Sequence, residues 1–225
     1  MRARTRIAVL GGLALVVVLA AWFAGSEGGG PTPARTAGSV RLGPDPGQAV
    51  AEYRADLARR LPAPGETTLA LLQLDRPLDT ATAAALAGPS PVVTAVFRVS
   101  LPRVQTALRF EPVTGTGDVA AALDVARQRA GFAAGADASR LGGRRAAVAS
   151  AEMRALDSPS CACLPALVVR ADRARLEALS TTPGVRAVDA APVGTQVTDL
   201  ALAPLLPEQT AAADPLPDDG PVPAA

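Results

Sequence analysis

The hydrophobic pattern divides this chain into one uninterrupted apolar segment and a longer region in which apolar positions are periodic. Residues 7–24, IAVLGGLALVVVLAAWFA, contain no charged side chain and follow three arginines within residues 1–6. Eighteen residues at about 1.5 Å rise form a helix of about 27 Å, close to the roughly 30 Å hydrocarbon core of a bilayer. The pattern therefore predicts a transmembrane helix over residues 7–24.

The distribution of arginine predicts how this helix is oriented. Three arginines lie within residues 1–6, and the next arginine in the chain is Arg35. Because positive charge is retained on the cytoplasmic side, we expect residues 1–6 to be a cytoplasmic stub and the remainder to lie outside, held to the cell membrane by a single pass. A cleaved signal peptide is the alternative, since cleavage after Ser26 would place Ala24 at the −3 position. Both versions put the remainder on the same side.

Composition divides the exterior region into three parts. Residues 25–48 are rich in Gly, Pro, Ser and Thr and have no apolar period, which predicts a flexible linker. Residues 208–225, EQTAAADPLPDDGPVPAA, have too few apolar side chains to offset the entropy of ordering, which predicts a disordered tail. Between them, residues 49–207 are expected to form one extracytoplasmic domain, with the apolar residues of 197–207 packed back on it.

Within residues 49–207 the apolar period alternates between that of a helix and that of a strand. The first half predicts a helix over 49–61, a strand over 68–75, a helix capped by Asp79 over 79–86, a strand over 92–99 and a half-buried strand over 104–111. The second half predicts a helix after Asp118 to about residue 134, a helix over 144–156, a strand over 166–171, a helix capped by Asp172 and a strand over 185–189.

The order of these elements predicts the fold class. Strand, helix and strand follow one another over 68–99 and again over 166–189. Two such units around one sheet are typical of the ferredoxin-like arrangement. We therefore expect an α+β domain with ferredoxin-like βαβ halves, an extra hairpin strand over 104–111 and an Ala-rich helical insertion over 118–156.

Composition then removes several classes of chemistry. All 22 basic residues are arginine, and the chain has neither lysine nor histidine. This excludes Ser-His-Asp and Cys-His catalysis, imidazole metal ligands, the P-loop and Schiff-base chemistry. The formal net charge is +1, so no basic stripe for nucleic acid is expected. Carboxylate catalysis stays open, but no pair can be nominated; the sequence predicts a chain without catalysis, cofactor or metal.

Cys161 and Cys163 are the one concentrated piece of chemistry in the sequence. On an extended strand their Cβ atoms would be roughly 6.5 to 7 Å apart, too far for the ~3.8 Å of a disulfide, so a local bridge requires a turn such as one at residues 158–160. Four alternatives stay open at this point. They are a bridge within the chain, a bridge joining two chains into a homodimer, thiols packed as small apolar groups, and thiolate binding of a soft metal such as Cu(I).

Residues 176–192, LEALSTTPGVRAVDAAP, resemble the last helix and strand of subtilisin-type propeptides, which are ferredoxin-like modules. Taken whole, the chain resembles an uncharacterised group of actinobacterial single-pass membrane proteins with an arginine-rich and alanine-rich exterior domain. The first resemblance implies a ferredoxin-like fold. Neither implies an activity or a functional residue.

Two functions follow as expectations. The first is a non-catalytic, membrane-anchored module that binds a protein partner in the cell envelope. The alternative is a thiol-redox or disulfide-linked envelope protein that uses Cys161 and Cys163. Nucleic acid is not an expected partner of either.

Overall fold

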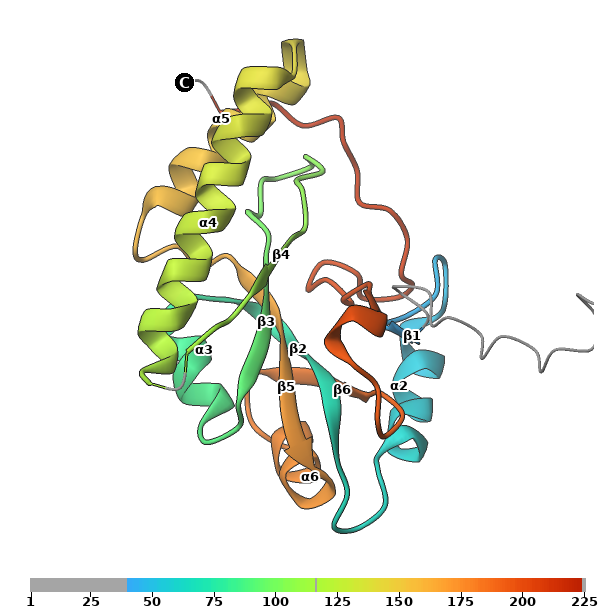
Figure 1. The fold of residues 1–225 in the computed structure, drawn as a ribbon. Coiled ribbons are helices and arrows are strands. Elements are labelled where there is room, and N and C mark those ends of the chain that lie inside the picture. Colours follow the sequence, from blue (N-terminus) through green and yellow to red (C-terminus); the bar gives the residue numbers. More distant parts are fainter. Residues whose placement is uncertain (1–39, 116, 224–225) are drawn as a thin grey trace, which may run out of the picture. The chain divides into compact units, whose positions relative to one another are not determined.

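A computed structural model describes residues 40–115 and 117–223 and shows a mixed α+β fold, as the sequence predicts (Figure 1). Its elements are β1 (Val40–Leu42), α2 (Val50–Arg60), β2 (Thr67–Leu78), α3 (Thr80–Ala87), β3 (Val92–Phe97), β4 (Arg109–Pro112), α4 (Val119–Arg140), α5 (Gly143–Asp157), β5 (Leu164–Asp172), α6 (Arg173–Ser180), β6 (Val185–Ala190), the 3-10 helix η1 (Val197–Asp199) and β7 (Leu200–Leu202). The expected stub and transmembrane helix lie outside the described residues. Within those residues, no helix combines the length and the apolar character that a membrane crossing requires.

Five strands form the main sheet in the order β4-β3-β5-β2-β6, and every neighbouring pair is antiparallel. The units β2–α3–β3 and β5–α6–β6 are interleaved, because β5 lies between β2 and β3 while β2 lies between β5 and β6. β4 adds a hairpin strand at the edge beside β3. The helices α4 and α5 are inserted between β4 and β5 and form an antiparallel pair beside the sheet (Figure 1).

Alternate residues of the strands bury the two faces of this sheet. On β2, Leu72 and Leu74 join the cluster formed with α3, α4 and α6, whereas Leu69 and Leu71 join a second cluster on the opposite face. Leu42 of β1 is buried in that second cluster. In Figure 1, α3 and α4 lie on one side of the sheet and α2 and β1 on the other. The sheet is thus covered on both faces.

The predicted helix caps are confirmed. The carboxylate of Asp79 accepts the N–H of Thr82 at 2.8 Å, and that of Asp172 accepts the N–H of Arg175 at 2.8 Å. Each carboxylate satisfies a donor that has no partner within its own helix, and its negative charge lies at the positive end of the helix dipole.

The strand expected over 104–111 is shorter in the structure, where β4 begins at Arg109. The reason lies in the backbone donors of the preceding residues. The N–H of Gln105 bonds the Asp218 carboxylate at 3.1 Å, and the N–H of Ala107 bonds the Glu152 carboxylate at 2.7 Å. These donors are therefore used by side chains distant in sequence instead of by a neighbouring strand.

The Ala-rich helix also differs from the expectation that it ends near residue 134. α4 continues to Arg140, through Gly131 and Gly135. A Cβ at Gly135 would lie 3.1 Å from the sulfur of Met153 on α5, so this glycine allows the two helices to approach closely. Gly135 is therefore a packing residue within α4.

Both flanks of the domain are more ordered than their composition indicates. Residues 40–48 were expected to belong to a flexible linker, but β1 pairs in parallel with β7 and Leu42 is buried. Gly43 has φ 113°, and a Cβ there would lie 1.8 Å from the carbonyl oxygen of Ala203. Only glycine fits this close approach.

The tail expected to be disordered from Glu208 follows a defined course through residue 223. The N–H of Ala213 bonds the carbonyl of Gln48 at 2.9 Å, and the N–H of Gly220 bonds the carbonyl of Arg103 at 2.7 Å. The tail contains little apolar surface of its own. Its course is therefore held by hydrogen bonds to distant segments and not by a hydrophobic core.

A buried carboxylate joins the N-terminal flank to the sheet. Asp189 on β6 is fully buried and accepts the N–H of Gly43 at 2.7 Å, the hydroxyl of Tyr53 at 2.9 Å and Nη1 of Arg60 at 3.0 Å. Gln73 donates to the same Tyr53 hydroxyl at 2.7 Å. Burial, reinforced by the Asp189 charge, raises the pKa of Tyr53 far above its usual value, so the phenol stays a donor.

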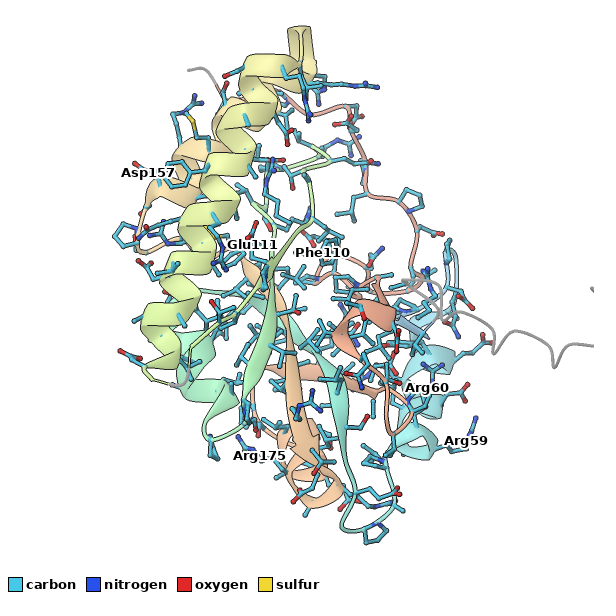
Figure 2. All side chains as sticks on the ribbon, in the orientation of Figure 1. Arg59, Arg60, Phe110, Glu111, Asp157 and Arg175 are labelled. Carbon is cyan, nitrogen blue, oxygen red and sulfur yellow. A yellow bond between two sulfur atoms is a disulfide. The ribbon has the colours of Figure 1, made fainter. Side chains whose placement is uncertain are left out.

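Tyr53→Phe tests this network. The change leaves Gln73 without its acceptor and Asp189 without one donor, so we expect the free energy of unfolding to fall by about 1 to 3 kcal/mol. Arg59→Ala on the same helix is the control, because that side chain is 74% exposed and should change stability by under about 0.5 kcal/mol (Figure 2). Urea unfolding measures both, and equal effects would contradict the role of the network.

Candidate functional site

The structure joins Cys161 and Cys163 in a disulfide with a Cα–Cα distance of 5.3 Å. Both residues lie in the irregular segment between α5 and β5, after a turn in which the N–H of Cys161 bonds the carbonyl of Ser158 at 3.1 Å. The backbone is therefore not extended there, which is the condition that a local bridge requires. Cys163 is 1% exposed and packs in the main core, whereas Cys161 is partly exposed.

The bridge is a small covalent loop at the entrance to β5. The carbonyl of Cys163 accepts the N–H of Arg98 at 2.8 Å, which ties the segment to the end of β3. Across the part of the chain that the structure describes, no group of three or more His, Cys, Asp or Glu residues is arranged to hold a metal ion.

A second polar group lies where α4, α5 and the start of β4 meet. Arg109 is only 9% exposed, and its guanidinium bonds Glu152 of α5 at 2.6 Å and Asp137 of α4 at 3.0 Å. Its Nε is buried and has no hydrogen-bond partner. These charge-assisted bonds attach the helical hairpin to the edge of the sheet.

An open pocket of about 380 Å³ adjoins this group, and its lining includes Gln105, Arg109, Arg144, Arg145, Val148 and Asp218. One side is the first turn of α5, whose N-cap residue Gly142 provides no side-chain cap. Arg144 and Arg145 add positive charge to the positive end of the helix dipole, an arrangement that favours an anionic occupant. Asp157 marks the opposite end of the same helix (Figure 2).

The chain's own C-terminal tail supplies that anionic group. It runs toward the ends of α4 and α5 in Figure 1, where Asp218 accepts the N–H of Gln105 at 3.1 Å and Nη2 of Arg144 at 3.1 Å. Asp219 forms an ion pair with Arg103. The hydrogen bond from Arg144 lowers the pKa of Asp218, and the one from Arg103 lowers the pKa of Asp219.

The start of the tail is held more firmly than its end. Glu208 bonds the buried guanidinium of Arg98 at 2.8 Å, and Arg186 donates to the carbonyl of Leu206 at 2.7 Å. Burial raises the pKa of Glu208, but the hydrogen bond and the charge of Arg98 outweigh it, so the net pKa lies below the usual range. Beyond Glu208 the tail borders a hollow of about 300 Å³ whose lining includes Arg98 and Pro217.

Sequence reasoning found the cysteines but missed the pocket beside α5. The signals were present as Gly142-Gly143-Arg144-Arg145 and as the acidic pair Asp218-Asp219 before Gly220. Taken alone, the first segment is typical of a turn and the second of a polar tail. No local feature of the sequence predicts that the two lie together in the fold.

Serine substitution at either cysteine tests the bridge. Both changes remove it, and closing so short a loop contributes at most roughly 2 kcal/mol. Cys163→Ser also buries a hydroxyl in the core, so we expect it to lower the free energy of unfolding by about 1 kcal/mol more than Cys161→Ser does. Urea unfolding measures the difference, and alkylation of both cysteines in the unreduced native protein would contradict the bridge.

Acid should release the tail. The pKa of Asp218 and of Asp219 is lower when the tail is bound than when it is free, so binding is complete above about pH 4 and is lost as the pH falls through the lowered values. The NMR shift of the Gly220 amide, followed from pH 6 to pH 2, measures the release. Asp218→Asn with Asp219→Asn should remove this titration, and a titration that persists in the double variant would contradict the assignment.

Comparison with known proteins gives no relative. No protein-family model, no curated protein and no solved structure matches this chain. The resemblance of residues 176–192 to subtilisin-type propeptides and that of the whole chain to actinobacterial membrane proteins stay predictions. The function is therefore inferred from the residues and geometry of the chain itself.

Proposed function

We propose that this chain is a membrane-anchored, non-catalytic module that binds a protein partner of the cell envelope through the pocket beside α5. One observation carries the proposal. The surface at the edge of this pocket already binds a stretch of polypeptide, residues 216–220, through side chains and through the main chain: Gln105 donates to the Leu216 carbonyl and Gly220 donates to the Arg103 carbonyl. A surface that binds one segment in this way has the groups needed to bind another.

The domain is ferredoxin-like in this proposal. The order β3-β5-β2-β6, antiparallel throughout and built from two interleaved strand–helix–strand units, supports that assignment. β4 and the α4–α5 hairpin are then additions to the basic arrangement. The pocket lies on the additions, in keeping with the general separation of a binding site from the scaffold that carries it.

Residues 7–24 anchor the module in the cell membrane, with residues 1–6 in the cytoplasm and the pocket outside. The uncharged run of residues 7–24 and the arginines before it support this placement. A partner located in the envelope follows from that orientation.

A thiol-redox role is the second candidate, and the Cys161–Cys163 disulfide is the observation that favours it. In this role a substrate thiolate attacks one sulfur, the other leaves as a thiolate, and a mixed disulfide forms. Cys161 is the more exposed of the two and is the sulfur that a substrate would reach. Failure of a small thiol such as glutathione to open the bridge in the native protein would exclude this role.

Site-specific photo-crosslinking in cells tests the binding role. A photo-reactive residue in place of Arg145, at the pocket, should give a reproducible adduct with one envelope protein. The same residue in place of Arg59, exposed on α2, is the control and should give none. Identical adducts from both positions, or none from position 145, would contradict the proposal.

The same cells test the orientation on which the proposal depends. An epitope added after Ala225 should be removed by protease applied to intact spheroplasts. An epitope that survives this treatment but is removed after lysis would place the domain in the cytoplasm and exclude an envelope partner.

A further inference from the structure

The tail segment at the edge of the pocket has the features of a bound ligand. Asp218 is held by a backbone donor and by Arg144, Asp219 by Arg103, and Gly220 by the Arg103 carbonyl at 2.7 Å. Arg103 itself has φ 56°, which is uncommon for a residue with a side chain. Carboxylates and main chain are thus recognised together, within three consecutive residues of the tail.

The charges around the pocket favour an acidic occupant. Apart from Asp218 of the tail, the lining holds three arginines, Arg109, Arg144 and Arg145, and two carboxylates, Asp137 and Glu152, both of which pair with Arg109. The tail supplies two carboxylates, and Arg145 has no ion-pair partner among the residues that the structure describes. Without the tail, the lining therefore carries one net positive charge.

Gly220, the third residue of the segment 218–220, is recognised by shape. A Cβ at Gly220 would lie 2.3 Å from the carbonyl oxygen of Pro102 and 2.8 Å from that of Arg103. Both neighbours are backbone atoms, which cannot move aside as a flexible side chain can. The surface therefore accepts a glycine directly after the acidic pair and rejects larger residues.

The occupant is held in a way that permits exchange. The side chains of both ion pairs are 42 to 62% exposed, so solvent and salt screen them. The hollow of about 300 Å³ beside Pro217 also leaves this part of the tail loosely packed. A competitor with the same groups can therefore replace it.

We propose that the surface formed by Arg103, Gln105 and Arg144 at the edge of the pocket recognises an acidic segment followed by glycine on a different envelope protein, and that residues 216–220 are an intramolecular competitor that covers this surface until the partner displaces them. This inference rests on the proposed binding function and names the chemistry of its partner. A polypeptide is favoured over an anionic lipid headgroup because Leu216 and Gly220 bond through the main chain.

Displacing the tail without changing its charge tests the competition. The probe is a fluorescent peptide with the sequence of residues 214–222, DPLPDDGPV, added to the full-length protein in detergent. Gly220→Ala should release the tail by steric conflict and tighten peptide binding by about tenfold, because a tethered competitor at millimolar effective concentration is removed. Asp218→Asn with Asp219→Asn releases the tail by a different change and should give a similar gain.

Two controls define the recognition in the Gly220→Ala protein. A peptide with the two aspartates directly before glycine replaced by asparagine, and one with glycine replaced by alanine, should each bind at least about tenfold more weakly. Arg103→Ala with Arg144→Ala should remove binding, whereas Arg59→Ala should leave it unchanged. Urea unfolding of each variant shows that the domain remains folded.

The outcomes separate this inference from the proposed function. Equal peptide affinity in the wild type and both tail variants would overturn the competition. Absence of peptide binding to every variant, while crosslinks from position 145 persist, would overturn the acidic partner and leave the binding function standing. Peptide binding without crosslinks would contradict the binding function. Two further results would also overturn the inference. Arginine-dependent binding of anionic vesicles without peptide binding would identify a lipid headgroup as the occupant. Dimer formation by Gly220→Ala would identify a second copy of this chain as the occupant.

Discussion

Buried arginine is the constraint that fixes the α4–α5 hairpin and the tail to the rest of this molecule. A guanidinium stays charged in a protein, so each buried one must be given acceptors. Arg98, Arg109 and Arg127 are all buried, and each bonds an acceptor on another segment. These acceptors are Glu208 of the tail, Glu152 of α5 and the carbonyl of Leu156 at the end of α5. Together they fix the hairpin to the sheet and the tail to the domain.

The sheet and the end of the tail differ in stability. The sheet has an apolar cluster on each face, and burial of its leucines and valines makes it a rigid scaffold. The last contacts of the tail are exposed ion pairs and single hydrogen bonds, which open at far lower cost. A firm scaffold with a loosely held tail at the edge of a charged pocket follows from this difference, and it is the physical basis for the displacement that we propose.

Local signals in the sequence were enough to predict the scaffold. The apolar runs of β2, β3, β5 and β6 and the capping aspartates are each read within a few residues, and the structure places an element at every one. The errors concern segments whose backbone partners lie far away. The segment before β4 is set by Glu152 and Asp218, α4 is continued by the contact of Gly135 with Met153, and the tail is ordered by Arg103. The disulfide was one of four alternatives in the sequence, while the pocket required the fold to bring its residues together.

Hydrogen exchange of the full-length protein, read in residues 103–107 and 216–223, tests the central claim most directly. Both segments should be protected in the wild type, because the N–H of Gln105 bonds Asp218 and that of Gly220 bonds Arg103. When the acidic peptide is added, residues 216–223 should lose protection while residues 103–107 keep it, since the peptide takes the place of the tail. Absence of protection in the wild type, or a tail that stays protected when the peptide is bound, would contradict the claim.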